Sequence, residues 1–440
     1  MKKRKMPPLA IVALSFLGII VTGTLLLKLP ISTQTEEALS WIDSLFLSAS
    51  AVCVTGLSTI PNIAETLSVF GKIVLALLIQ IGGLGIVTIA IYVLVIFGIR
   101  IGVTERYVLR EALNQHHLGG MVRLVRSIVF TSLIIEGFGM IINFIVFIKE
   151  FSFFEAIGHS AFHAISSFNN AGFDILGNSS LQNYNNNILL NINTMVLIII
   201  GGIGFIVIRD IIEKKSWKNL SLYSKIVLKM TLFLIITGTF LVKFLEYNNI
   251  SWLEAIFTSV TTRTAGFSTV DISLFSYTTL VVIIIFMFIG ASPNSTGGGV
   301  KTTTIFVMFK SITSFLIGKP CITHRRKIDD QNRNKAFVLV TIAFSVTIFI
   351  FLIVSLIESN NPSHDRGFIE VLFETFSAFG TVGLSTGITP FLRPSSKVIL
   401  SILMYIGRLG PITIFGIMNK NWGHPEVSHI DYPIEKILVG

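Results

Sequence analysis

Four short stretches of small and polar residues each end in a glycine that is followed by Leu or Phe. They are Cys53-Val54-Thr55-Gly56, Asn169-Asn170-Ala171-Gly172, Arg263-Thr264-Ala265-Gly266 and Gly380-Thr381-Val382-Gly383. The glycines are 116, 94 and 117 residues apart, and a Phe precedes each of them by nine or ten residues. Glycine permits the unusual dihedrals that turn successive carbonyls toward one axis. Four such strands around an axis would form rings of oxygens able to replace the hydration shell of a monovalent cation.

The last three residues of each stretch are therefore the candidate selectivity filter of an ion pathway. These residues are Val54, Thr55, Gly56, Asn170, Ala171, Gly172, Thr264, Ala265, Gly266, Thr381, Val382 and Gly383. No ring of Asp or Glu accompanies them in the sequence, since Asp174 is single, and this disfavours a divalent-selective site. The alternative is that the glycines only allow close helix packing, as small residues do in membranes. The shared register of four glycines favours the filter.

The composition requires a membrane protein. The 440 residues are 52% hydrophobic and 13% charged, with a mean hydropathy of +0.77. A water-soluble domain carries about 25% charged residues, and a helix needs roughly 20 apolar residues to cross a bilayer. Eight such runs lie near 8–28, 67–98, 127–148, 188–208, 226–246, 275–290 with a continuation at 303–309, 336–357 and 395–418.

Between each odd and even run lies a semi-polar stretch that is too short to cross. These stretches are Trp41 to Ala51, Phe153 to Phe168, Trp252 to Thr262, and Phe368 to Phe379. Each is predicted to be a half-helix that enters from outside and ends near mid-membrane, where its dipole places partial negative charge. The extended backbone that follows at membrane depth is tolerated where it lines a water-filled cavity.

The predicted fold is therefore an all-α integral membrane protein of four fused span/pore-loop/span repeats around a central pore. It has eight long transmembrane helices and four re-entrant half-helices. The repeats are 1–98, 127–208, 226–309 with a broken second span, and 336–418, followed by a C-terminal tail at 419–440.

Basic residues predict the orientation of these repeats. The termini and the junctions between repeats hold 24 Lys or Arg, and the opposite side holds seven. The positive-inside rule therefore places both termini in the cytoplasm. Because the basic residues lie in short gaps between apolar runs, the net charge of +10 indicates cytoplasmic loops and not a nucleic-acid partner. The first run follows four basic residues but is long enough to span, so it is interpreted as an uncleaved first span.

The second span of the third repeat is interrupted by Ser, Pro, Asn and three consecutive glycines, a composition that cannot remain a lipid-facing helix. Such a break must face protein or water, directly under the filter; a glycine-hinged kink is the alternative. Lys301 follows this break, and Arg408 lies near the end of the last apolar run. Placing a charged side chain inside the membrane is costly in free energy. Arg408 is expected to point toward the pore and bind carbonyls of the 290–300 loop. The residues of this break and the two cations are Ser292, Pro293, Asn294, Ser295, Thr296, Gly297, Gly298, Gly299, Lys301 and Arg408.

At these residues the chain resembles the potassium transporters of the Trk/Ktr/HKT superfamily, most closely the Ktr-type membrane subunit of bacteria. The resemblance rests on the four glycine strings, on GASPNSTGGGVKTTT from Gly290 to Thr304, on GRLGP from Gly407 to Pro411, and on the terminal DYPIEKILVG. It implies potassium uptake across the bacterial cell membrane through a four-loop filter. It also implies an intramembrane gate formed by the loop from Ser292 to Gly299 with Lys301 and Arg408.

The resemblance also implies partners. It suggests a homodimer in the membrane and a cytosolic ring of RCK/KTN-type regulatory subunits, with ATP or ADP on those subunits. No cofactor is expected in this chain, and potassium is the expected substrate. A serine in place of the first filter glycine is associated with sodium transport in plant members, so Gly56 favours potassium.

Two other function classes would require different sequence features. An integral-membrane enzyme would need a convergent cluster of His, Asp, Glu or Ser at one depth, and the sequence shows none, so the chain is predicted not to be an enzyme. A sodium or sodium/potassium transporter shares the whole architecture and would differ only at the filter.

Overall fold

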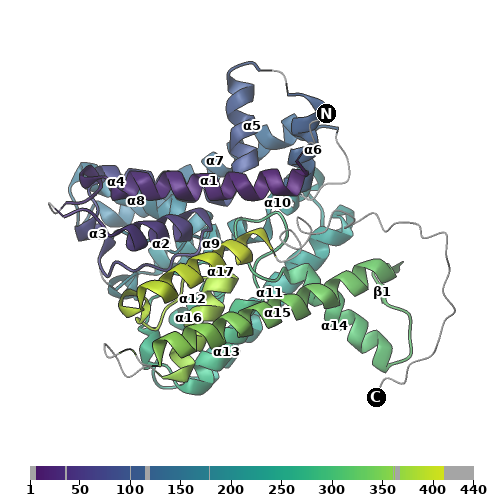
Figure 1. Ribbon diagram of the computed structural model, residues 1–440. Helices are drawn as coiled ribbons and strands as arrows, with labels where there is room; N and C mark the ends of the chain where they lie inside the picture. Colours follow the sequence, from purple (N-terminus) through teal and green to yellow (C-terminus); the bar gives the residue numbers. More distant parts are fainter. Residues whose placement is uncertain are drawn as a thin grey trace.

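A computed structural model (Figure 1) describes residues 6–34, 37–99, 101–113, 119–177, 179–359, 361 and 367–410. Four long apolar helices begin the four predicted repeats. They are α1 (Pro8–Lys28), α7 (Met121–Phe147), α11 (Leu222–Leu245) and α15 (Asp330–Glu358). Among the described residues, these are the single helices that are long and apolar enough to cross a membrane, and each buries only part of its surface. The helical membrane architecture agrees with the prediction.

Four shorter helices follow them at the positions predicted for the half-helices. They are α2 (Trp41–Val52), α8 (Phe153–Phe168), α12 (Trp252–Thr261) and α16 (Phe368–Gly380), and every boundary lies within one residue of the prediction. Ser40, Ser152 and Ser251 cap the first three, and each of the four carries an acidic residue in its first turn. Acidic groups in the first turn stabilise a helix because they accept hydrogen bonds from its free N–H groups and interact favourably with the positive end of its dipole.

The second helices of the repeats differ from the prediction, because those of repeats one and two are broken as well. Helices α4 (Val69–Leu84) and α5 (Ile86–Ile96) meet at 99°, and α9 (Ile188–Ile203) and α10 (Phe205–Lys214) meet at 95°. The apolar runs 67–98 and 188–208 are therefore not continuous spans. The breaks lie at Gly85 (φ 86°) and Gly204 (φ 90°), a backbone region that favours glycine.

Repeat three is interrupted as predicted, between α13 (Tyr277–Phe288) and α14 (Thr302–Leu316). In repeat four, α17 (Pro394–Leu409) ends at Gly410; residues 411–418 of the predicted span and the tail at 419–440 lie outside the described residues. The remaining elements are short: α3 (Ile63–Thr66), α6 (Val103–Ala112), the hairpin of β1 (Ile322–Thr323) and β2 (Arg326–Lys327), and 3-10 turns at Pro30–Ser32, Gln182–Tyr184, Trp217–Asn219, Ile272–Leu274 and Thr389–Phe391.

Contacts between successive repeats follow one rule. The second helix of each repeat packs against the half-helix of the next, as α4 on α8, α9 on α12 and α13 on α16, and α17 packs on α2. In Figure 1, α17 (yellow) lies between α2 (purple) and α15 (green), so the last described helix packs against the first half-helix. These four contacts close a ring, and the strands that follow the half-helices lie inside it.

Candidate functional site

The four predicted filter strands meet at their glycines. A Cβ added to Gly56 would lie within 3.0 Å of the Ala171 carbonyl oxygen, and one added to Gly172 would lie as close to the Ala265 carbonyl oxygen. Gly266 stands in the same relation to Val382, and Gly383 to Thr55. Each glycine therefore touches the backbone of the next strand, and the fourth touches the first. The four glycines and the residues that directly precede them form one closed ring, with no room for a side chain at the glycines.

The four strands share an alternating backbone conformation. The residue two positions before each glycine has a positive φ although it carries a side chain: Val54 (57°), Asn170 (58°), Thr264 (66°) and Thr381 (50°). The glycines also have positive φ, from 70° to 96°. Such conformations cost about 1 to 3 kcal/mol each for residues with a side chain and persist where the surroundings enforce them.

The burial pattern is the same in every strand. The two residues before each glycine are fully buried, whereas the glycine itself is partly accessible. The accessible atoms at this depth are thus backbone atoms of the glycines, which face the interior of the ring.

Hydrogen bonds from the half-helices hold the strands. The N–H groups of Gly56 and Gly383 each donate to a serine hydroxyl, of Ser50 and Ser377, at 3.1 Å. A tight turn follows each glycine. In it, the side chain of the second residue after the glycine accepts a hydrogen bond from the backbone N–H of the fourth residue after the glycine. The accepting residues are Ser58 (3.0 Å), Asp174 (3.2 Å), Ser268 (3.4 Å) and Ser385 (2.8 Å).

The fourth strand has an additional support that the sequence did not reveal. Glu374 of α16 is 1% exposed and accepts the Ser385 hydroxyl at 2.5 Å, the Thr386 N–H at 3.0 Å and the Thr389 hydroxyl at 2.8 Å. A buried carboxylate with several donors fixes the loop that follows Gly383. Glu374 therefore positions the outer end of one strand without facing the glycine ring.

The predicted gate residues, Ser292 to Gly299, form a loop closed at its base by the Gly290 N–H, which donates to the Val300 carbonyl at 2.9 Å. The break of repeat two holds one side of this loop. The Ser292 hydroxyl donates to Gly202 O at 2.9 Å, and the Phe205 N–H donates to Asn294 O at 3.0 Å. From α11, the Tyr223 hydroxyl donates to Pro293 O at 2.7 Å.

The same loop contacts the inner ends of three filter strands. The Thr296 hydroxyl donates to Asn170 Oδ1 at 2.9 Å, and the Gly298 N–H donates to Thr381 Oγ1 at 3.1 Å. Gly297 lies against Thr264, where an added Cβ would clash with the hydroxyl. Three of the four residues with positive φ therefore touch the loop, which places it directly beneath the ring.

Arg408 lies where its guanidinium reaches both the loop and α4. Nη1 donates to the Thr296 carbonyl, and Nη2 donates to the carbonyls of Gly82 at 2.6 Å and Gly83 at 3.3 Å. Lys301 Nζ donates to the Gly297 carbonyl at 2.8 Å. Both cations are thus satisfied by backbone oxygens of the loop and its surroundings.

Arg408 belongs to a repeated motif that the sequence analysis did not identify. The strings IGGLG at 81–85, IGGIG at 200–204 and IGRLG at 406–410 end at the three glycines with φ from 83° to 90°. The first glycine of each string lies against the carbonyl at the end of a half-helix, of Val52, Phe168 or Phe379. Arg408 occupies the position that is glycine in the other two strings. Aligning the second helices as well as the half-helices would have revealed the breaks.

Comparisons with known proteins agree with this architecture. The sequence model of the family described as "TrkH: Cation transport protein" matches residues 8–422. The chain is 38% identical to "Ktr system potassium uptake protein B" of Bacillus subtilis (strain 168), over 98% of this chain and 97% of that protein. It is 37% identical to "Potassium/sodium uptake protein NtpJ" of Enterococcus hirae, over 100% and 99% of the two chains.

The fold is similar to the crystal structure of the potassium transporter TrkH from Vibrio parahaemolyticus. The TM-score is 0.72 at 17% sequence identity, covering 96% of this chain and 87% of that chain. The matched family transports cations, which confirms that the chain is not an enzyme. From the match over residues 8–422, and from two full-length relatives more than 30% identical, the chain belongs to the TrkH family of cation transport proteins.

Proposed function

We propose that the chain takes up potassium ions through the ring formed by Gly56, Gly172, Gly266 and Gly383. The observation that carries this proposal is the closed succession of contacts between these glycines and the neighbouring strands. The alternating backbone conformation supports it, because positive φ at every second residue allows successive carbonyls to face one axis. Rings of carbonyl oxygens can replace the water around a dehydrated potassium ion.

Potassium is the proposed substrate because the ring contains backbone oxygens and no carboxylate. Relatives named as potassium uptake proteins, at 38% and 34% identity, support the same substrate. The proposed filter consists of the twelve strand residues. Gly56 and Gly383 are held by hydrogen bonds to half-helix hydroxyls, and Asn170 and Thr381 by hydrogen bonds to the loop beneath.

The loop from Ser292 to Gly299, with Lys301 and Arg408, is the proposed gate. It lies under the ring and is anchored by hydrogen bonds that a modest movement would break. We further propose that a cytosolic RCK/KTN-type ring, carrying ATP or ADP, biases this loop and that the membrane subunit is a homodimer. Relatives named as components of a Ktr system support such a partner.

The proposed location is the bacterial cell membrane, with both termini in the cytoplasm. The distribution of Lys and Arg, 24 on one side and seven on the other, supports this orientation. A cysteine introduced at Lys214 should react with an impermeant thiol reagent only from the cytoplasmic side, and one at Asn183 only from outside. Labelling of the Lys214 position from outside would overturn the orientation.

A sodium-conducting or mixed transporter is the second candidate. It is favoured by the 37% identity to a protein named as a potassium/sodium uptake protein. The two candidates share the glycine ring, so they differ only in how strongly the ring discriminates between the two ions.

Rubidium uptake in cells that lack their own potassium uptake systems tests the proposal. The parent protein should restore saturable rubidium uptake that potassium inhibits and sodium inhibits weakly. Equal inhibition by both ions would favour the mixed transporter. Co-expression with a Ktr-type cytosolic subunit should raise the rate. No uptake with or without that subunit would overturn the proposed function.

A further inference from the structure

A buried carboxylate lies behind the second filter strand, among α4, α7 and α8. Glu136 of α7 is 6% exposed, and both of its oxygens accept N–H groups from Gln80 Nε2 of α4 at 3.0 Å. Asn169, the C-cap of α8, donates from Nδ2 to Glu136 Oε1 at 3.1 Å. An ionisable side chain inside a membrane helix is costly and is retained mostly for function.

The orientation of the two amides follows from a backbone carbonyl. Asn169 Nδ2 also donates to Ile165 O at 2.9 Å, so this atom must be the nitrogen and not the oxygen. Asn169 Nδ2 then donates to Gln80 Oε1 at 2.8 Å, which leaves Gln80 Nε2 facing Glu136. Every group that faces Glu136 is therefore a donor. An ionised carboxylate accepts only, whereas a protonated one would oppose its own O–H to a donor.

Glu136 forms no ion pair with any side chain of the described residues. Within the described ranges, the ion pairs of the protein involve other carboxylates, and the contacts of Glu136 are with neutral amides. A buried charge without a counter-charge is strongly unfavourable. An ionised Glu136 therefore requires a counter-charge from outside these side chains.

The filter lies one residue away. Asn169 is followed by Asn170, which has a positive φ of 58°, lies in the glycine ring's second strand and binds the gate loop through Thr296. On its other side, Asn169 Oδ1 lies against Gly83, whose carbonyl accepts from Arg408. Glu136 therefore contacts, through Asn169, the strand whose next residue, Asn170, binds the gate loop.

We propose that Glu136 is a fixed negative charge that stabilises the transported cation at the inner end of the filter. This inference rests on the proposed function, because it assigns the role of counter-ion to potassium itself. It makes Glu136 an affinity determinant that does not touch the ion, and it assigns Gln80 and Asn169 the task of keeping the carboxylate ionised without a salt bridge.

The test exchanges the charge between two positions of the same cluster. Glu136→Gln removes the charge at nearly constant shape and should raise the KM for rubidium about fivefold to twentyfold, with little change in maximal rate. Adding Gln80→Glu to that variant returns a carboxylate to the cluster, where Asn169 can still donate to it. The double variant should restore the KM to within about twofold of the parent.

A second measurement separates charge from structure. The melting temperature of the purified protein should rise with potassium concentration, because the ion binds the folded state. Glu136→Gln should reduce that rise. The control Glu246→Gln, at a buried carboxylate beyond the end of α11, should lower the melting temperature equally with and without potassium.

The outcomes distinguish the two claims. A full potassium effect in Glu136→Gln, or a double variant as impaired as the single one, would overturn the role of Glu136 alone. No potassium effect in the parent would overturn the proposed function. If Glu136→Gln does not reach the membrane, the double variant and Glu136→Asp carry the test. Both keep a charge, so a KM raised more than about fivefold in both would reject the proposal.

Discussion

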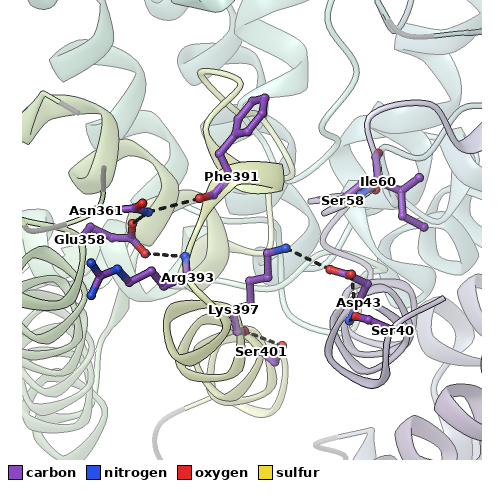
Figure 2. Close-up of polar contacts among 10 residues, drawn as sticks. All are labelled: Ser40, Asp43, Ser58, Ile60, Glu358, Asn361, Phe391, Arg393, Lys397 and Ser401. Carbon is purple, nitrogen blue, oxygen red and sulfur yellow. Dashed lines mark hydrogen bonds and ion pairs between the residues drawn. The ribbon is translucent and has the colours of Figure 1, made fainter. Parts of the chain in front are cut away.

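Lys397 Nζ lies 3.0 Å from Asp43 Oδ1, although 354 positions separate the two residues in the chain. Figure 2 shows the lysine of α17 directed at the first turn of α2, where Ser40 also binds Asp43. Repeats one and four have no peptide link to each other, so side chains must join them. This ion pair stabilises the junction between α17 and α2, the one junction of the ring whose two repeats are not consecutive in the chain.

Separating the pair should weaken that junction. We expect Lys397→Met to lower the free energy of unfolding by about 1 kcal/mol, since the lysine is 12% and the aspartate 27% exposed and partly buried pairs exceed the value of fully exposed ones. Asp43→Asn also removes a negative charge from the N-terminus of α2. The double variant of Lys397→Met and Asp43→Asn is therefore needed to separate that effect from the loss of the ion pair. A double-mutant cycle read by thermal unfolding in detergent should give a coupling energy; additive effects would show that the ion pair does not stabilise this junction.

A second junction, within repeat three, depends on pH. Glu246 follows α11 and accepts the Ser276 N–H and the Thr279 hydroxyl at the start of α13. Burial alone would raise the pKa of Glu246, but the hydrogen bonds from Thr279, Ser276 and Asn249 lower it below its usual value. A carboxyl with a lowered pKa stabilises the fold above its unfolded pKa of about 4.3. That stability is lost as the pH falls through the folded-state pKa.

The melting temperature of the parent should therefore fall more steeply than that of Glu246→Gln between about pH 5 and pH 3. At pH 7 the variant should be less stable by about 1 to 2 kcal/mol, because it loses a charged acceptor. Parallel curves for the two proteins would show that Glu246 has the same pKa when unfolded.

Composition and periodicity predicted the long helices and the half-helices, because the bilayer imposes a length and a polarity that local sequence displays. The four glycine strings predicted the ring for a similar reason, since only glycine fits where strands touch. The breaks at Gly85 and Gly204 were missed because the flanking residues are as apolar as those of a straight helix. Only the comparison of IGGLG with IGRLG reveals them.

Partners of polar residues could not be predicted. The sequence indicated that Arg408 would bind the loop, and the contact with Thr296 is present. It did not indicate Tyr223, Gly202 or Asn170, because their contacts join helices whose spacing depends on the whole ring. Glu136, a lone carboxylate in an apolar run, was missed, because its amide donors belong to α4 and to the end of α8.

The glycine ring predicts a difference between Gly383, in the fourth filter strand, and Gly387, in the loop that follows it. Gly383 and Gly387 both have positive φ, of 91° and 90°, so alanine is strained at either position. Only at Gly383 would the new methyl group meet the Thr55 carbonyl, since nothing lies within 4 Å of Gly387. Gly383→Ala should therefore raise sodium uptake relative to rubidium uptake at least about fivefold, and Gly387→Ala should keep the parent ratio. Equal ratios in both variants would exclude Gly383 from the pathway.

The gate prediction concerns hydrogen bonds on opposite sides of the loop. Arg408 holds Thr296 from α17, and Tyr223 holds Pro293 from α11. A bond from a charged donor is worth about 1.5 to 3 kcal/mol and one from a neutral hydroxyl about 0.5 to 1.5 kcal/mol. If the loop is closed at rest, Arg408→Gln should raise rubidium flux roughly tenfold or more and Tyr223→Phe roughly twofold to tenfold, each with less dependence on a co-expressed regulatory subunit.

The matched control is Tyr405→Phe, which removes a tyrosine hydrogen bond of 2.8 Å to Ala13 O on α1, away from the loop. Deletion of Ser292 to Gly299 should raise flux further and also alter the ratio of sodium to rubidium uptake, because the loop supports Asn170 and Thr381 at the inner ends of two strands. The point variants leave those two contacts in place, so they should raise flux and preserve the ratio. If Tyr223→Phe and Arg408→Gln behave like Tyr405→Phe while all three reach the membrane, the loop does not limit the flux, and the narrowest point of the pathway is the glycine ring itself.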